Sequence, residues 1–167
     1  SASSGGACGE TREVKLETMT WLEAERVLTD DAVVVLPLGA QLKEHGPHLP
    51  LRNDWLIAEY FARRVEEREA AVLAPTLQHH FYPVFVEYAG SVTLREETAR
   101  DLVVDVVRSL SRPGPRRFYV LNTGISTLRA LRPAADVLAE EGILLRFTDT
   151  RAALAAATRG VLEQEGG

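Results

Sequence analysis

Carboxylate and imidazole side chains are concentrated in one stretch of the chain, residues 43–54. It contains Glu44, His45, His48 and Asp54, together with one glycine and two prolines. Carboxylate oxygens and imidazole nitrogens are ligands for zinc, manganese or magnesium, and a proline-containing loop holds such ligands in position. The stretch therefore predicts either a divalent-metal site or a hydrogen-bonded structural loop, and Asp54 has the further option of capping a helix.

A second stretch, residues 78–88, combines aromatic and polar side chains and contains the adjacent histidines His79 and His80. This mixture suits a pocket wall that packs a flat substrate and offers hydrogen bonds, and it equally suits a lid or a subunit contact. Neighbouring side chains of an extended segment point in opposite directions, so we expect at most one of the two histidines to face a site.

A hydroxyl-rich turn occupies residues 122–127, with the order Asn-Thr-Gly-Ile-Ser-Thr. Its hydroxyl and backbone N–H groups can hold an oxyanion or a phosphate, and they can equally start a helix. Asn122 and Ser126 are therefore candidate catalytic residues, as parts of an oxyanion hole. The candidate substrate-binding residues of the chain are His48, His80, Tyr82, Glu87 and Thr123.

Apolar strand patterns alternate with helix patterns along the chain. The predicted strands cover residues 32–38, 71–75, 117–121 and 143–147. The predicted helices run from Thr20 to about Leu28, from Asn53 onward, from Thr93 onward, and over 133–141 and 151–163. Capping boxes at Thr20–Glu23 and Thr93–Glu96 mark two helix starts, and Gly142 marks one helix end. This alternation predicts a layered α/β/α sandwich with a mainly parallel sheet.

The three polar stretches follow predicted strands. Residues 39–54 follow the first strand, 78–91 the second and 122–127 the third, while Asp149 follows the fourth. In an open parallel sheet, ligands bind at the carboxyl ends of the strands. All four histidines fall on this edge. We therefore expect the chemistry of the protein to take place there.

The composition limits the class of protein. The 167 residues are 46% hydrophobic and 26% charged, as in a globular domain, and a net charge of -5 argues against a nucleic-acid-binding face. The single cysteine, Cys8, excludes a disulfide within the chain, and no apolar run is long enough to span a membrane. We expect a flexible leader at 1–15 and a single α/β domain at 16–167, located in the cytoplasm or exported after signal removal.

Two motifs carry a family resemblance. The run from Leu36 to Ala40, followed by His45 to Leu51 and then Asp54, resembles the signature of the creatininase (creatinine amidohydrolase) family. Residues 87–94 resemble that family's Pro-Gly-Thr turn, and residues 119–122 resemble the strand before its Asn-Gly-His motif. The resemblance implies hydrolysis or formation of cyclic and linear amides with one or two divalent ions that activate a water. It carries a ligand histidine to His45 and a bridging aspartate to Asp54.

Two positions depart from the family pattern. Lys43 stands where the family has a ligand glutamate, and Gly124 stands where it has a ligand histidine. The stretch from Gly39 to His45 is one residue longer than the usual pattern, so we expect a bulged loop that brings Glu44 into the vacated ligand position.

The leading hypothesis is a creatininase-like hydrolase of a small amide that uses zinc or manganese. His45, Asp54 and Glu44 are its expected ligands, and Glu44 is also a candidate catalytic residue. The alternatives are a self-processed, metal-free amidohydrolase and a catalytically degenerate binding or scaffold subunit.

The resemblance also bears on partners. Family members continue into a segment that completes the pocket, so we expect the domain to be incomplete at its C-terminus and bound to a companion C-terminal chain or fragment. An end at Gly167 is compatible with self-cleavage, proteolysis or disorder. We further expect a homo-oligomer, with residues 81–88 in a subunit contact, a small-molecule amide as substrate, and neither nucleic acid nor membrane as a partner.

Overall fold

The computed structural model describes residues 15–68 and 70–162. Its sheet contains β1 (Val33–Leu38), β2 (Val72–Leu73), β3 (Arg117–Asn122) and β4 (Leu144–Phe147), in the order β2-β1-β3-β4. Each neighbouring pair is parallel, and β1 and β3 are in register from Val33 opposite Arg117 to Leu38 opposite Asn122. The predicted parallel α/β architecture is confirmed, although β2 is shorter than the predicted strand.

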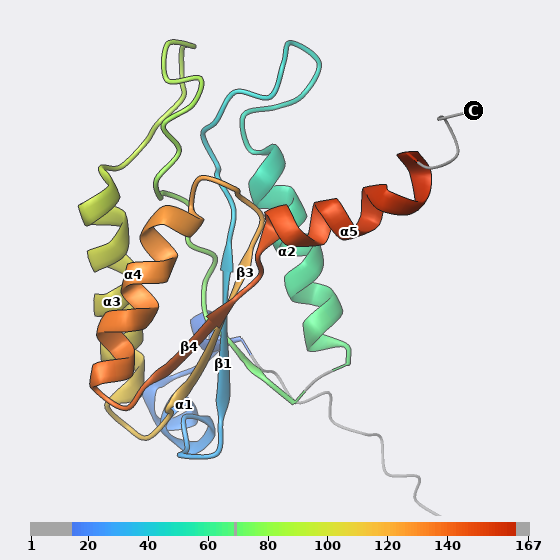
Figure 1. Ribbon diagram of the computed structural model, residues 1–167. Coiled ribbons are helices and arrows are strands. Elements are labelled where there is room, and N and C mark those ends of the chain that lie inside the picture. The colour runs from blue at the N-terminus through green and yellow to red at the C-terminus, as the bar shows by residue number, and fades with distance from the viewer. Residues whose placement is uncertain (1–14, 69, 163–167) are drawn as a thin grey trace, which may run out of the picture.

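Helices cover both faces of this sheet. The short 3-10 helix η1 (Leu16–Thr18) and α1 (Trp21–Val27) precede β1, and the longer helices are α2 (Asn53–Glu66), α3 (Glu96–Ser111), α4 (Leu128–Glu140) and α5 (Thr150–Leu162). Figure 1 shows α3 and α4 on one face and α2 on the other, with α1 beside the amino end of β1, while α5 extends away from the sheet at its carboxyl end. The loops that follow β1 and β2 rise at the opposite, carboxyl end of the strands.

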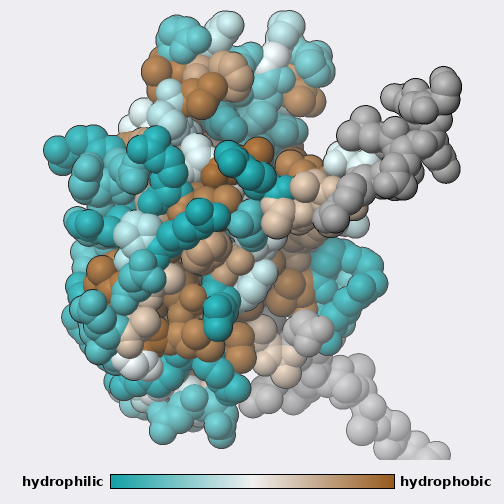
Figure 2. Space-filling view, in the orientation of Figure 1, coloured by the Kyte–Doolittle hydropathy of each residue, from teal (hydrophilic) through white to brown (hydrophobic). Residues whose placement is uncertain are grey.

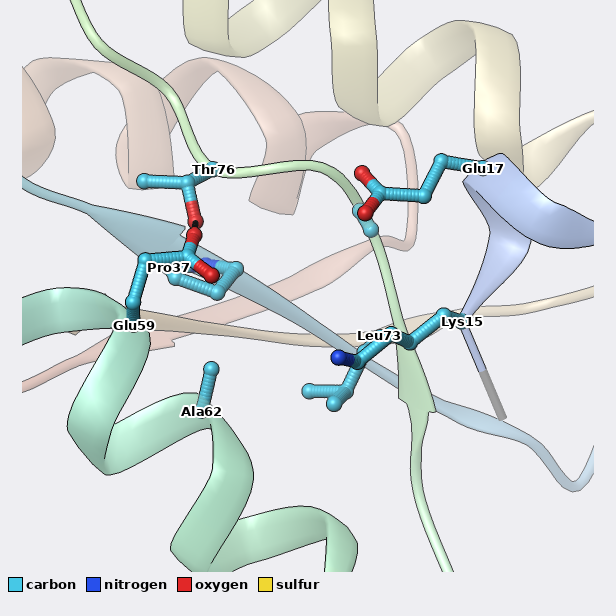
Figure 3. A pocket seen from close by; sticks show the side chains of 8 residues that line it. Lys15, Glu17, Pro37, Glu59, Ala62, Leu73 and Thr76 are labelled. Atoms are coloured by element: carbon cyan, nitrogen blue, oxygen red, sulfur yellow. Dashed lines mark hydrogen bonds between the residues drawn. The ribbon is translucent and has the colours of Figure 1, made fainter. Parts of the chain in front are cut away.

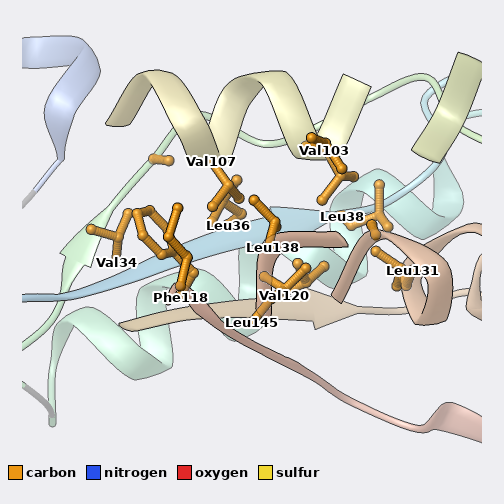
Figure 4. Close-up of a cluster of buried hydrophobic side chains, with 14 of the residues drawn as sticks. Val34, Leu36, Leu38, Val103, Val107, Phe118, Val120, Leu131, Leu138 and Leu145 are labelled. Atoms are coloured by element: carbon orange, nitrogen blue, oxygen red, sulfur yellow. The ribbon is translucent and has the colours of Figure 1, made fainter. Parts of the chain in front are cut away.

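The main core lies between the sheet and the pair α3 and α4 (Figure 4). It is built from fully or nearly fully buried side chains of the strands and of the two helices: Val34, Leu36, Leu38, Phe118, Val120, Leu145, Val103, Val107, Leu131 and Leu138. Alternate residues of a strand point to one face, which is why the three β1 members lie two positions apart. Each such side chain stabilises the fold by about 1.5–3 kcal/mol through burial.

Helix α2 contacts the sheet through small residues. Ala58 and Ala62 are buried, whereas Leu56, Ile57 and Tyr60, whose spacing predicts the helix, are exposed. The apolar periodicity therefore identifies the helix but not its buried face.

Further apolar side chains are exposed on the loop after β2, namely Val84, Phe85, Val86 and Tyr88. Figure 2 shows apolar surface at the loops on top of the molecule and along the middle of the view, where β4 lies.

The helix ends test the predicted signals. The first capping box is confirmed, since the Thr20 hydroxyl accepts from the Glu23 backbone and the Glu23 carboxylate accepts from the Thr20 backbone. The second predicted capping box, at Thr93–Glu96, is wrong. Helix α3 begins at Glu96, and the side chain of its N-cap residue, Arg95, makes no capping hydrogen bond. The hydroxyl of Thr93 instead accepts a 2.8 Å hydrogen bond from the Tyr82 backbone. A tertiary contact with the preceding loop thus replaces the local cap.

Helix α4 begins five positions before the predicted start and contains Pro133 within it. The hydroxyl-rich turn, rather than the proline, sets its beginning. Its predicted end is confirmed, because Gly142 has φ +71° and Ile143 N donates to Leu138 O at 3.0 Å, which closes a Schellman motif.

Several predictions concern residues outside the described part of the chain. These are the leader apart from Lys15, the cysteine Cys8, the last predicted helical residue Glu163, and the end at Gly167. None of the helices within the described ranges is both long enough and apolar enough to cross a membrane.

Candidate functional site

A cavity of about 590 Å³ opens at the carboxyl end of the sheet. It is bounded by the loop after β1, the start of α2, the loop after β2, the turn between β3 and α4, and the first turns of α4 and α5. Its lining residues are Lys43, His45, Asp54, Tyr82, Pro83, Val84, Phe85, Thr123, Gly124, Ile125, Ser126, Arg129, Thr150, Arg151 and Leu154. The three polar stretches of the sequence therefore meet at one pocket.

Gly39 fixes where Asp54 lies. It follows β1 directly, and a Cβ added there would lie 2.3 Å from the backbone oxygen of Asp54 and 2.8 Å from Cβ of Ala58. Only glycine allows this approach of α2 to the strand. Trp55 N donates to Ala40 O at 3.0 Å and ties the same two segments. As a result Asp54 is buried, in the first turn of α2, where the helix dipole favours a carboxylate.

Asp54 has a basic partner at each of its carboxylate oxygens. Oδ1 lies 2.8 Å from Nε2 of His45, and Oδ2 accepts from the Lys43 ammonium at 3.2 Å. Nδ1 of His45 lies 2.8 Å from the backbone oxygen of Lys43. A carbonyl oxygen and a carboxylate oxygen both accept hydrogen bonds, so each ring nitrogen of His45 faces an acceptor, and these two contacts hold the ring with Nε2 towards Asp54.

Glu44 takes no part in this cluster. Its carboxylate accepts from the backbone N–H of Gly46, which has φ +88°, and its own backbone N–H donates to Ser91 Oγ at 3.1 Å. The structure thus places Lys43, and not Glu44, beside Asp54. Within residues 15–68 and 70–162, no group of three or more His, Cys, Asp or Glu side chains is arranged to hold a metal ion. An ammonium beside a pair of potential donors does not fit a divalent-ion site.

The turn after β3 is held by the side chain of Asn122. Its Oδ1 accepts from Gly124 N at 3.1 Å and from the hydroxyl of Thr127 at 2.7 Å. Its Nδ2 donates to Gly124 O at 2.6 Å and to Thr148 O at 3.2 Å. Asn122 is buried and does not line the pocket, so in this structure it shapes the turn that presents Thr123 and Ser126.

The hydroxyls of these two lining residues already donate to backbone oxygens. Thr123 Oγ1 donates to Leu38 O at 2.9 Å, and Ser126 Oγ donates to Phe81 O at 3.0 Å. Each hydroxyl oxygen keeps lone pairs that can accept from a ligand. The turn therefore connects β1 and the loop after β2 while it forms one wall of the cavity.

Tyr82 and His80 are both buried, but only Tyr82 lines the cavity. Among the described residues the Tyr82 hydroxyl has no hydrogen-bond partner, and burial, together with the nearby Asp54 carboxylate, raises the pKa of this tyrosine. It therefore stays a neutral phenol that can donate to a ligand. The His80 ring lies 6.3 Å from the Tyr82 ring, and burial lowers the pKa of His80 to about 4.

The remaining predicted site residues lie elsewhere. His48 and Glu87 are exposed on loops and do not line the cavity. Of the predicted residues, the structure brings together His45, Asp54, Tyr82, Thr123 and Ser126, and it leaves Glu44, His48, His80, Glu87 and Asn122 outside the lining.

Two lining arginines were not predicted from the sequence. Arg129 lies in the first turn of α4, where it pairs with Glu96 at 2.7 Å and stacks over the Phe81 ring at 5.1 Å. Arg151 lies in the first turn of α5. The available signal was a basic residue soon after the end of a predicted strand. With Lys43, these cations outnumber Asp54, the one carboxylate among the described lining residues, and they favour a ligand with negative or partly negative oxygen atoms.

Apolar side chains form the outer wall of the cavity, and they include Val84, Phe85, Ile125 and Leu154. Phe85 has φ +69°, a left-handed conformation that is unfavourable for a residue with a bulky side chain. Such strain is retained where surrounding contacts fix the backbone, and it is frequent at binding sites.

A much smaller cavity lies between α2 and β2 (Figure 3). Its volume of about 20 Å³ suffices for about one water molecule. The hydroxyl of Thr76 donates to the Glu59 carboxylate at its edge, and Lys15 reaches it from the opposite side. It is too small for a substrate.

Known proteins with similar sequences include two kinds of enzyme. The chain matches the family described as creatinine amidohydrolase over residues 17–166. A creatinine amidohydrolase from Pseudomonas putida is 33% identical over 118 residues, 67% of this chain and 45% of that protein. A mycofactocin precursor peptide peptidase from Mycobacterium tuberculosis is 31% identical over 119 residues, 65% of this chain and 47% of that protein. The chain spans about half the length of these curated relatives.

Solved structures of creatininases have a fold similar to that of this chain. A crystal structure of creatinine amidohydrolase (creatininase) superposes with a TM-score of 0.70 at 27% identity, covering 82% of this chain and 57% of that chain. A mutant creatininase described as Zn-Zn type has a TM-score of 0.70, and a structure described as creatininase Mn has 0.69, each at 27% identity over 82% of this chain and 58% of the other.

Proposed function

The chain belongs to the creatininase family, and from this premise we propose that it forms the binding and reaction pocket of an amidohydrolase that cleaves the C–N bond of a small polar amide. The observation that carries the proposal is the pocket at the carboxyl end of the sheet, where His45 and Asp54, at the positions of the family signature, face the turn at 122–127. The names of the two similar enzymes support a C–N bond as the target.

Hydrolysis of an amide requires a polarised carbonyl and a positioned water. The Lys43 ammonium donates one hydrogen bond to Asp54, which leaves donors for the carbonyl oxygen of a substrate. Asp54 can accept a proton from the attacking water through lone pairs that its two partners do not use, and it can return this proton to the amide nitrogen as the C–N bond breaks. The phenol of Tyr82 and Arg129 at the mouth orient the polar groups of the same substrate.

The donor atoms of this site bear on whether it uses a metal ion. The similar structures include forms described as Zn-Zn type and Mn. In enzymes generally, a bound divalent ion can act as a Lewis acid and activate a water. In this chain the donors at the corresponding place are His45 and Asp54, with Lys43 paired to the carboxylate. The original hypothesis of a zinc or manganese site built with Glu44 therefore lacks support from the geometry, and no step of the proposed reaction uses a metal.

Amine release tests the proposal. The purified 167-residue chain is incubated with a panel of cyclic amides, creatinine among them, and short peptide amides, and the liberated amine is quantified by mass spectrometry. Wild type is expected to hydrolyse at least one member, and Asp54→Asn to reduce the rate at least about 100-fold through loss of the carboxylate that accepts the proton. Glu87→Gln, a matched change at an exposed residue outside the cavity, is expected to retain the rate. Absence of turnover across the panel would overturn the proposal.

A second candidate is a binding subunit without catalysis, favoured by the ion pair between Lys43 and Asp54, which gives each group a partner of opposite charge without a substrate. It predicts saturable binding of a small carboxylate or amide to the chain, measured by calorimetry, without amine release. Self-processing, the other alternative, predicts a cut in the polypeptide that persists when proteases are excluded. Intact-mass measurement would detect such a cut, and a single uncut polypeptide would contradict this alternative.

A further inference from the structure

We propose that the Lys43 ammonium is a built-in cation which takes the position of a divalent ion at the His45–Asp54 pair, so that this pair binds no metal. The proposal concerns metal exclusion and does not depend on whether the chain hydrolyses amides. It rests on the arrangement of three side chains and on the chemistry of their donor atoms.

The histidine is oriented as a ligand would be. Its Nδ1 lies 2.8 Å from a backbone oxygen, that of Lys43, and this contact holds the ring with Nε2 directed to Asp54. Metal-binding histidines are held in this way by a hydrogen bond from the other ring nitrogen. Two potential ligand atoms, Nε2 of His45 and Oδ1 of Asp54, are thus held 2.8 Å apart inside a cavity.

The position beside these atoms is already occupied by positive charge. Nζ of Lys43 lies 3.2 Å from Asp54 Oδ2, and both side chains are largely withdrawn from solvent, with 20% and 11% of their side-chain surface exposed. A divalent ion bound to the same carboxylate would lie only a few ångströms from the ammonium. Their repulsion is strong in a partly buried site, where screening by water is weak.

The Lys43 ammonium also balances the negative charge of the Asp54 carboxylate, which a metal ion would otherwise balance. A carboxylate that is nearly buried needs a cation or several hydrogen-bond donors, and Asp54 has both in Lys43 and His45. Its helix-start position adds the partial positive charge of the α2 N-terminus. Asp54 is therefore stable in the fold without a metal.

The loop backbone holds Lys43 in this position. Lys43 N donates to Leu51 O at 3.1 Å across the loop, and the following residue, Glu44, is tied through its backbone to Ser91. The Nζ atom also lies 6.0 Å from the centre of the Tyr82 ring, on whose face a cation is favoured. The lysine side chain is therefore held by the loop on one side and by the cavity wall on the other.

Metal binding by untagged protein tests the inference. Zn²⁺ and Mn²⁺ are titrated separately into wild type, Lys43→Glu and Lys43→Gln, and stoichiometry is measured by calorimetry and by elemental analysis after gel filtration. Lys15→Glu is the matched control, because it makes the same charge change at the only other lysine, outside the pocket. Wild type and the control are expected to retain no ion, whereas Lys43→Glu, which supplies a third ligand, binds one ion at least about 100-fold more tightly.

Two further measurements make the outcome decisive. The double change Lys43→Glu with Asp54→Asn must lose the gained ion, which separates the pocket from the exposed histidines His48 and His79. Far-ultraviolet circular dichroism verifies that each variant is folded, and if Lys43→Glu does not fold, Lys43→Gln is expected to bind more tightly than wild type by loss of repulsion alone. One equivalent of Zn²⁺ or Mn²⁺ retained by wild type and lost in Asp54→Asn would overturn the inference.

Discussion

His80 gives a sharp prediction for the pH dependence of stability. It is fully buried, and burial lowers its pKa from 6.5 to about 4, although the nearby Ala99 backbone offsets part of this effect. In the unfolded chain the ring takes up a proton as the pH falls through 6.5, whereas the folded chain resists protonation until about pH 4. The neutral ring therefore contributes stability that is complete above pH 6.5 and is lost progressively between pH 6.5 and 4.

The size of the effect follows from the two pKa values. One pH unit corresponds to about 1.4 kcal/mol of unfolding free energy for a single proton, so the total loss is about 3 kcal/mol and the loss at pH 5 is about 2 kcal/mol. Replacing His80 by phenylalanine removes the titrating group and retains an aromatic ring at a buried position. The variant is expected to lack this part of the pH dependence, whatever its stability at pH 7.

Urea unfolding followed by circular dichroism at pH 7 and pH 5 measures this pH dependence of the unfolding free energy. The difference in unfolding free energy between the two pH values should be about 2 kcal/mol larger for wild type than for His80→Phe. His79→Phe is the matched control, since His79 is the exposed neighbour and should leave the wild-type dependence unchanged. Equal pH dependence in wild type and His80→Phe would show that His80 is not held neutral by burial, and the reasoning would be refuted.

Three other outcomes follow from the structure. In the amine-release assay, Asp54→Ala should abolish activity, whereas His48→Ala, which changes an exposed loop residue, should retain most of it. Leu131→Ala should lower the unfolding free energy by about 2–5 kcal/mol in urea titrations because it leaves a cavity under α4, while Leu22→Ala at an exposed site should cost less than about 1 kcal/mol. Light scattering should find a species larger than the 18.4 kDa chain, because the apolar side chains exposed on α2 and the loop after β2 favour association with a second copy or a companion chain; a stable monomer would contradict this expectation.

Local patterns predicted most of the fold because they report local physics. Buried parallel strands require continuous apolar runs, and Thr20 with Glu23 satisfies helix-start donors within four residues of sequence. The same kind of pattern failed at Thr93, where the hydroxyl bonds to the Tyr82 backbone instead. A cap and a tertiary contact use the same atom, and sequence does not show which partner is closer.

The candidate site was predictable in place but not in arrangement. The topology of a parallel sheet brings the loops after β1 and β3 to one edge, which the order of strands in the sequence already implies. Whether Lys43 or Glu44 turns towards Asp54 depends on a shift of one residue in the loop. That shift is fixed by contacts to Leu51 and Ser91, the latter 47 positions away from Glu44, and residue spacing alone does not report them.

The contact of Gly39 with the backbone of Asp54 separates two roles in the pocket: β1 and α2 position the aspartate, and the loop between them supplies neighbouring groups. This separation bears on how such a site diverges in evolution. Because strand and helix are joined directly there, and again by Trp55 N to Ala40 O, the intervening loop closes on itself and does not determine where the aspartate lies. Insertions and amino-acid substitutions within residues 41–52 can then be accepted one at a time, because the position of the Asp54 carboxylate does not change. The side chains that contact Asp54 from this loop can therefore change in evolution while β1 and α2 stay the same.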